Sequence, residues 1–176
     1  ECSSLVEIII PSTVISIGNY SFSKCSSLTQ IIIPSSVTSI GNYSFSGCSK
    51  LTEIRIPSSV TSIGSSVFSK CTSLVQATIL SQEKSIKDHF FTECKSLNQV
   101  ILPQSLTSIE DYAFSECCKL EQITIPSSVT SIGNNSFAGC KSLVQIQISS
   151  SISWIGDYAF SKCSKLTQIA IQSSSL

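Results

Sequence analysis

Methionine is absent from the 176 residues, histidine and tryptophan occur once each, and charged residues make up only 12% of the chain. Acidic and basic residues are equal in number, so the formal net charge is zero. This balance argues against a nucleic-acid partner, because phosphate binding requires an excess of clustered Lys and Arg. No apolar run in the sequence approaches the ~20 residues of a membrane-spanning helix, and we expect no direct membrane insertion.

Catalytic and metal-binding sets are missing as well. The single His89 has no Cys or His partner at metal-site spacing, because the cysteines do not form C-x-x-C pairs. The sequence also has no Gly-rich phosphate loop and offers no Ser-His-Asp set. We therefore expect neither enzyme activity nor a metal or other cofactor.

Eight of the nine cysteines, seven of the eight phenylalanines and eight of the twelve leucines instead recur every 23 positions. The cysteines are Cys2, Cys25, Cys48, Cys71, Cys94, Cys117, Cys140 and Cys163. The phenylalanines are Phe22, Phe45, Phe68, Phe91, Phe114, Phe137 and Phe160. The leucines are Leu5, Leu28, Leu51, Leu74, Leu97, Leu120, Leu143 and Leu166. A fixed period in this range, with Leu-x-x-Ile-x-Ile blocks, is typical of a leucine-rich-repeat solenoid.

The unit from Cys25 to Gly47 shows how one repeat can build one coil. Ile31 and Ile33 alternate as on one face of a strand, and Pro34 ends the strand because it has no N–H for the ladder. A polar Ser-Ser turn follows. Such a unit cannot bury its own apolar face, so only a stacked array is stable.

In the second half of the same unit, Val37 and Ile40 are expected to point inward, with a second short strand over residues 38–40. Asn42 is placed to cap a short helical turn over residues 43–45. Phe45 then fills the core. The cysteine column is predicted to be a ladder of buried free thiols, since Cys is a small and often buried side chain.

We therefore expect a strand-rich α/β-type repeat solenoid, right-handed, with short helical or 3-10 turns on its convex side and one concave, parallel sheet. About eight strands are predicted, near residues 6–10, 29–33, 52–56, 75–79, 98–102, 121–125, 144–148 and 167–171. Residues 1–176 would form a single domain of about 7.5 repeats. Because methionine and a signal peptide are both absent, we expect the chain to be a piece of a longer protein.

The pattern L-x-x-I-x-I-P-x-S-V-T-S-I-G-x-x-x-F-x-x-C resembles the BspA-type leucine-rich repeat, also called the Treponema pallidum type. Residues 97–117 (LNQVILPQSLTSIEDYAFSEC) and 120–140 (LEQITIPSSVTSIGNNSFAGC) carry it well. The resemblance covers the whole chain in eight in-phase copies.

The resemblance implies a function. Proteins of this type are similar in being surface antigens of bacteria and protists that are associated with adhesion to host matrix proteins and cells. It thus implies a non-catalytic module at the cell surface or outside the cell, with a host matrix or cell-surface protein as its ligand. The alternative is an intracellular scaffold that uses the same array, because free buried thiols suit that setting equally. Open solenoid ends could also pair with other copies of the chain.

Two columns of residues on the sheet are candidates for protein binding. The more variable column is Ile9, Ile32, Arg55, Thr78, Ile101, Thr124 and Gln147. The amide-rich column is Gln30, Glu53, Gln76, Gln99 and Gln122. Variation can encode specificity, and exposed apolar groups often mark interaction surfaces. The isoleucines also suit a strand by propensity alone, and the amides could instead bond to one another along the stack.

Other candidates are isolated. Trp154 replaces a Ser of the other repeats and is a possible exposed anchor. Asn19, Asn42 and Asn134 each begin an N-glycosylation triplet, although their column also suits a cap. The lysines cluster around the cysteine corner, where a solvated edge is the simplest interpretation.

Overall fold

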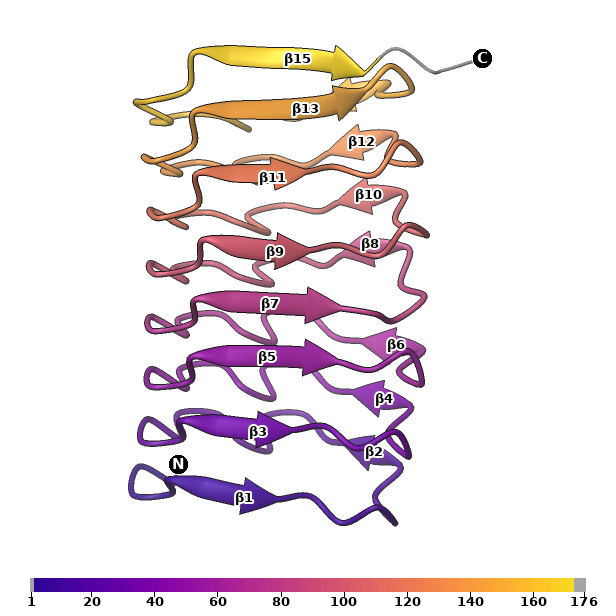
Figure 1. Ribbon diagram of the computed structural model, residues 1–176, viewed down its shortest axis with the longest axis vertical. Helices are drawn as coiled ribbons and strands as arrows, with labels where there is room; N and C mark the ends of the chain where they lie inside the picture. Colours follow the sequence, from indigo (N-terminus) through magenta and orange to yellow (C-terminus); the bar gives the residue numbers. More distant parts are fainter. Residues whose placement is uncertain (1, 173–176) are drawn as a thin grey trace.

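The computed structural model describes residues 2–172, which wind into a stack of coils with one 23-residue repeat per coil (Figure 1). One side of the stack carries the front strands, and another carries the shorter back strands. The front strands are β1 (Glu7–Ile9), β3 (Gln30–Ile32), β5 (Glu53–Ile56), β7 (Gln76–Ile79), β9 (Gln99–Ile101), β11 (Gln122–Thr124), β13 (Gln145–Ser149) and β15 (Gln168–Gln172). The back strands are β2 (Ser16–Ile17), β4 (Ser39–Ile40), β6 (Ser62–Ile63), β8 (Ser85–Ile86), β10 (Ser108–Ile109), β12 (Ser131–Ile132) and β14 (Trp154–Ile155).

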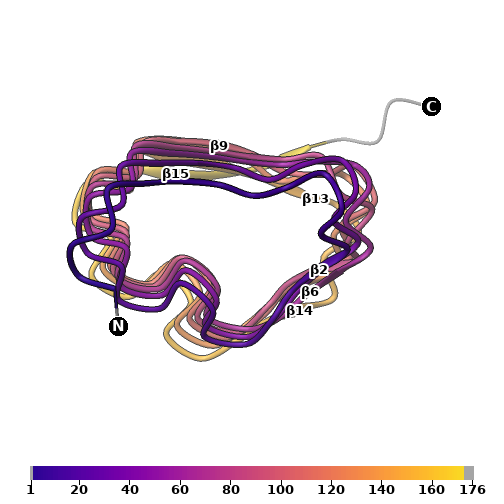
Figure 2. The ribbon, with the colours of Figure 1, turned by 90° about the horizontal axis from the view of Figure 1, so that it is seen from below.

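All strand pairs are parallel, and each residue pairs with its equivalent in the next coil. Ile8 pairs with Ile31, for example, and Ile17 pairs with Ile40. Seen along the stack, the coils superpose with little displacement (Figure 2). The eight predicted front strands and the second short strand near residues 38–40 are thus confirmed.

The front strands do not form the single ladder that the sequence predicted. Their hydrogen-bonded groups are β1-β3, β5-β7-β9 and β11-β13-β15. Strands β3 and β5 still pack side by side, as do β9 and β11. The front face is therefore continuous, but its ladder is interrupted at two seams.

The predicted helical turns are wrong, because residues 2–172 contain no helix. The third side of each coil is a series of turns with two residues in the left-handed region, such as Tyr43 (φ 55°) and Gly47 (φ 76°). In this conformation alternate N–H groups point along the stack. Tyr43 donates to the carbonyl of Ser65 (3.0 Å) and Gly47 donates to that of Ser69 (2.8 Å). Each side of a coil is thus tied to the next coil by backbone hydrogen bonds, except at the two front seams and between the back strands β6 and β8, where the strand ladders are interrupted.

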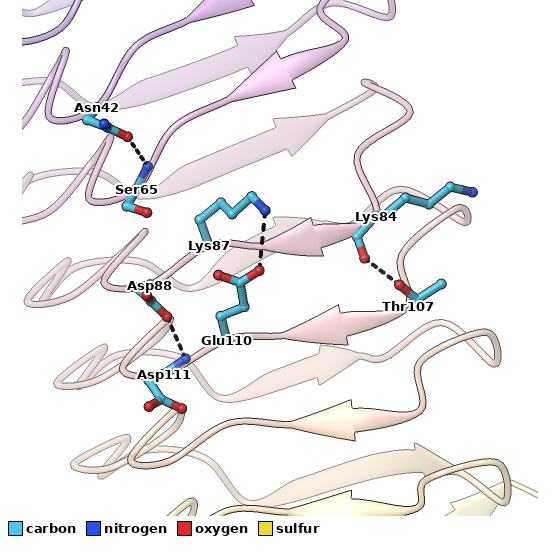
Figure 3. A network of polar contacts seen from close by, with 8 residues as sticks. All are labelled: Asn42, Ser65, Lys84, Lys87, Asp88, Thr107, Glu110 and Asp111. Atoms are coloured by element: carbon cyan, nitrogen blue, oxygen red, sulfur yellow. Dashed lines mark hydrogen bonds and ion pairs between the residues drawn. The ribbon is translucent and has the colours of Figure 1, made fainter.

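Asn42 consequently does not cap a helix. Its Oδ1 accepts a hydrogen bond from the backbone N–H of Ser65, its equivalent in the next coil, at 2.8 Å (Figure 3). Asn19, Asp111 and Asn134 make the same bond to the coil that follows them, at 2.7 Å. The column that looked like a set of caps is therefore a ladder along the stack.

The core is a set of columns that run through the stack. The leucines that recur every 23 residues are fully buried from Leu28 to Leu143, and the phenylalanines of the repeat stack on one another. The ring centroids of Phe45 and Phe68 lie 5.5 Å apart with nearly parallel planes. Each ring thus packs against its counterparts above and below, which a single repeat could not provide.

The cysteine column is the predicted ladder of free thiols. From Cys48 to Cys163, each Sγ–H of the column donates to the carbonyl of the phenylalanine 26 residues earlier, as in Cys71 to Phe45 (3.2 Å) and Cys94 to Phe68 (3.1 Å). Burial is the main cause that raises the pKa of these thiols, to about 12 for Cys48 and well above the ordinary value for Cys71. The thiols are therefore held in the protonated, unreactive form.

Candidate functional site

The variable column lies on the front face and is largely exposed. Ile9 and Ile32 are 84% and 82% accessible on adjacent coils, and Ile101 is 54% accessible. Arg55, Thr124 and Gln147 are also exposed. Ile9 and Ile32 pair directly across β1 and β3, so together they form an apolar patch at the N-terminal end of this face.

Thr78 departs from the expected exposed row, since it is only 7% accessible. It pairs with Arg55 in the coil before it and with Ile101 in the coil after it. Thr78 is thus a short side chain with a longer one on either side. Thr78 therefore lies on the front face without presenting much of itself to a partner.

The amide-rich column is exposed at Gln30, Glu53, Gln99 and Gln122 and partly exposed at Gln76. Within residues 30–122, no hydrogen bond joins successive side chains of this column. Hydrogen bonding between successive amides, one of the two alternatives that the sequence allowed, is thus not observed in these coils. These amides keep their donors and acceptors available to a ligand.

Two hollows lie on the front face at the two seams of the ladder. One, of about 400 Å³, is lined by Gln30 and Ile32 on one side and by Thr52, Glu53 and Arg55 on the other. It spans β3 and β5, which are not hydrogen-bonded as strands. The candidate residues of the second and third coils thus surround one concavity.

The second hollow, of about 390 Å³, spans β7, β9 and β11. Ile101, Gln99 and Thr124 are among its lining residues. Sequence reasoning missed both hollows, because the repeat pattern is uninterrupted at the seams. The one local signal at the first seam is Arg55, the only arginine in the chain, where other coils have Ile, Thr, Gln or Ala.

Arg55 forms no ion pair within residues 2–172, although Glu53 stands two residues away on the same strand. Its guanidinium has five N–H donors in a planar fork, which suits carboxylates and amide carbonyls. An apolar patch, an open hollow and an unpaired guanidinium thus lie next to one another on the front face. This arrangement presents apolar, amide and cationic groups on one surface.

The isolated candidates have different surroundings. Trp154 is 48% accessible in β14, at the C-terminal end of the stack, away from the front-face hollows. The hydroxyls of Ser44 and Ser136, in the triplets that begin at Asn42 and Asn134, are fully buried. In the triplet that begins at Asn19, Ser21 is exposed.

Other chemistry finds little support in the described residues. Burial and the charge of Glu116 raise the pKa of the Cys118 thiol, which disfavours a reactive thiolate. Within residues 2–172 no group of three or more His, Cys, Asp or Glu is placed to hold a metal ion. The same part of the chain contains no helix long and apolar enough to cross a membrane.

Comparisons with known proteins agree with this architecture. The BspA type leucine rich repeat region matches six copies, over residues 1–117 and 84–176. No match was found among curated protein sequences. A solved leucine-rich repeat protein from Eubacterium ventriosum is 34% identical, with a TM-score of 0.84 over 90% of this chain.

A leucine rich cell surface protein from Faecalibacterium prausnitzii is 30% identical over 91% of the chain, with a TM-score of 0.68. The T. pallidum leucine rich repeat protein, at 24% identity and a TM-score of 0.52, shares the fold. The chain spans 43% of the Eubacterium protein and 59% of the Faecalibacterium protein. Since the repeat matches run from the first residue to the last, the chain belongs to the BspA-type leucine-rich repeat family.

Proposed function

We propose that this chain is a non-catalytic, protein-binding module that acts at the cell surface or outside the cell, with the front face as its contact surface. The observation that carries the proposal is the exposed pair Ile9 and Ile32 beside the unpaired Arg55 and the hollow at the first seam. Arginine is among the residues that contribute most to protein interfaces, and exposed apolar groups often mark interaction surfaces.

The ligand proposed is a host extracellular matrix or cell-surface protein. Family membership and the likeness to a cell surface protein of Faecalibacterium support a location outside the cell. The extended front face supports a polypeptide ligand rather than a small molecule, because its hollows are open to solvent. An intracellular partner for the same face is the competing possibility.

The first experiment locates the chain. Intact cells would be treated with a protease, and the released peptides would be identified. Release of repeat peptides, while an internal control protein stays intact, supports the surface location. Complete protection of the repeats would point to an intracellular scaffold.

The second experiment tests the face. Ile9→Ala, Ile32→Ala and Arg55→Ala combined should reduce binding to immobilised matrix proteins or host cells by roughly tenfold or more, as expected for central interface residues. A matched control combines Thr124→Ala and Gln147→Ala, which lie in the same column on later coils. Equal binding by the two variants would exclude the first-seam surface as the contact site.

A further inference from the structure

The charges of this neutral chain are unevenly distributed over its surface. Seven turns, at residues 24–27, 47–50, 70–73, 93–96, 116–119, 139–142 and 162–165, directly precede the front strands from β3 to β15. They line one edge of the stack, at the left in Figure 1. We call this edge the lysine ridge.

The ridge holds most of the lysines of the chain. They are Lys24, Lys50, Lys70, Lys95, Lys119, Lys141, Lys162 and Lys165, all exposed. Its only carboxylates are those of Glu93 and Glu116. Eight positive against two negative charges give the ridge a net charge of +6, whereas the rest of residues 2–172 carries three cations and eight carboxylates.

Few of these lysines are neutralised by neighbours. Glu93 lies 3.9 Å from Lys70 and 3.8 Å from Lys95. The last three turns contain four lysines that form no ion pair within the described residues, at positions 119, 141, 162 and 165. This half of the ridge therefore presents its positive charge to solvent.

The remaining residues of the ridge narrow the class of ligand. Besides the cysteines, its seven turns contain only Lys, Ser, Thr, Gly and Glu. There is no aromatic ring on which nucleic-acid bases could stack, and no Trp, Phe or Leu that could enter a lipid interface. The hydroxyls of Ser49 and Thr72 bond loosely, at 3.3 and 3.4 Å, to carbonyls of the preceding coil, and they stay partly exposed.

We propose that the lysine ridge binds a linear acidic polysaccharide that lies along the stack. The lysines would contact its sulfate or carboxylate groups, and the Ser and Thr hydroxyls would contact the sugar hydroxyls. Successive coils repeat at roughly strand spacing, about 4.8 Å, which is comparable with one sugar unit of an extended chain. This site is distinct from the front-face contact surface and does not depend on it.

The test uses heparin as the probe and the full chain as the protein. Lys141→Ser with Lys165→Ser removes two charges of the ridge, and each change installs a residue that other coils carry in the same column. Lys84→Thr with Lys87→Gly removes two charges elsewhere, again towards the residues of other coils. The two variants therefore have the same net charge.

The unaltered chain should bind heparin at low salt but not neutral dextran. The ridge variant should bind roughly tenfold more weakly, and the slope of log affinity against log salt should fall by about 1.5. The off-ridge variant should bind like the unaltered chain. Equal loss in both variants, or no salt-sensitive binding by the unaltered chain, would overturn the proposal.

Two further probes separate the ligand classes. Oligo-dT and vesicles that contain phosphatidylserine should both bind more weakly than heparin. If either binds as tightly and loses affinity in the ridge variant, the ridge recognises nucleic acid or membrane and the polysaccharide assignment is wrong. Retention of heparin binding by the variant with Ile32→Ala and Arg55→Ala separates this result from that for the front face.

Discussion

The carboxamide of Asn42 occupies the space that a side chain at Gly64 would need. A Cβ at Gly64 would collide with the Oδ1 and backbone of Asn42, the same Oδ1 that accepts the N–H of Ser65. The same relation links Gly41 to Asn19 and Gly156 to Asn134. Glycine in these coils is thus favoured by the polar ladder residue of the coil before it, although Glu110 stands at this position after Asp88, whose ladder bond from the N–H of Asp111 is longer, at 3.1 Å.

Gly41→Ala should therefore destabilise the chain. Its Cβ would lie 2.5 Å from the backbone N of Asn19, which cannot move without breaking the ladder. We expect a loss of about 1–3 kcal/mol in the free energy of unfolding, as for other overpacked sites, measured by urea denaturation. Gly18→Ala is the matched control, since its Cβ would meet only the flexible Ser21 hydroxyl at 3.3 Å. Equal losses at both positions would contradict the steric explanation.

One pair of neighbouring coils has neither the glycine nor the Asn or Asp of the ladder. Lys87 stands at the glycine position, and the preceding ladder position holds the short Ser65 (Figure 3). Lys87 instead contacts Glu110, with its Nζ 3.3 Å from Oε1. That ion pair is about one-third exposed at each side chain, so its contribution to stability is small.

The two positions should be energetically coupled. Ser65→Asn alone would set a long side chain against the Cβ of Lys87, and Lys87→Gly alone would leave a gap beside Ser65. The double variant restores the arrangement of Asn42 with Gly64. We expect the double variant to be more stable than the sum of the single changes predicts by about 1 kcal/mol, measured as a double-mutant cycle in urea. If the two changes in the free energy of unfolding were simply additive, the positions would not be coupled, and the steric explanation would be wrong.

Much of the fold could be predicted because the repeat specifies its own contacts. Inward residues such as Ile31 and Val37 follow from alternation, and a 23-residue period aligns them with their copies. The failures concern interactions between coils. An Asn before a turn is compatible with a helix cap and with an inter-coil hydrogen bond alike. The left-handed conformation of Tyr43 cannot be predicted from its residue type.

The candidate site was predictable in outline only. The exposure of Ile9 and Ile32 follows from strand alternation. The burial of Thr78 does not follow from alternation, which places it in the same column as the exposed Arg55 and Ile101. The hollows of about 400 and 390 Å³ coincide with seams of the ladder, and only the first of these seams is marked in the sequence, by Arg55.

Two buried hydroxyls are a further departure from good packing. Ser44 and Ser136 are fully buried, and their Oγ atoms have no hydrogen-bond partner in the described part of the chain. The same column holds Ala113 and Ala159 in other coils. A buried hydroxyl without a partner is unfavourable because it has lost its bonds to water.

Ser44→Ala and Ser136→Ala should each stabilise the chain by about 1 kcal/mol, because the unsatisfied group is removed and the cavity is small. Thermal and urea unfolding would both report the change. Ser36→Ala is the contrasting control, since its hydroxyl donates to the carbonyl of Val14 at 2.7 Å and its loss should destabilise. Destabilisation by all three changes would mean that Ser44 and Ser136 have partners in solution.

The thiol ladder should make the fold sensitive to alkaline pH. Burial raises the pKa of Cys48 to about 12, and that of Cys71 and Cys117 well above the ordinary thiol value, whereas an unfolded thiol titrates near pH 8.5. The stabilisation is fully present below pH ~8.5. It falls as pH rises towards the folded values, because the unfolded chain then releases protons that the native chain retains.

Each such thiol should lower the free energy of unfolding by about 1.4 kcal/mol per pH unit above this point. Cys71→Ala should therefore reduce the steepness of the decline between pH 8.5 and 10 by about one proton, measured by urea unfolding under reducing conditions. Val60→Ala, which also opens a fully buried site but removes no titrating group, should lower stability without changing the slope. Identical slopes in the two variants would mean that the Cys71 thiol ionises equally in the native and unfolded chains.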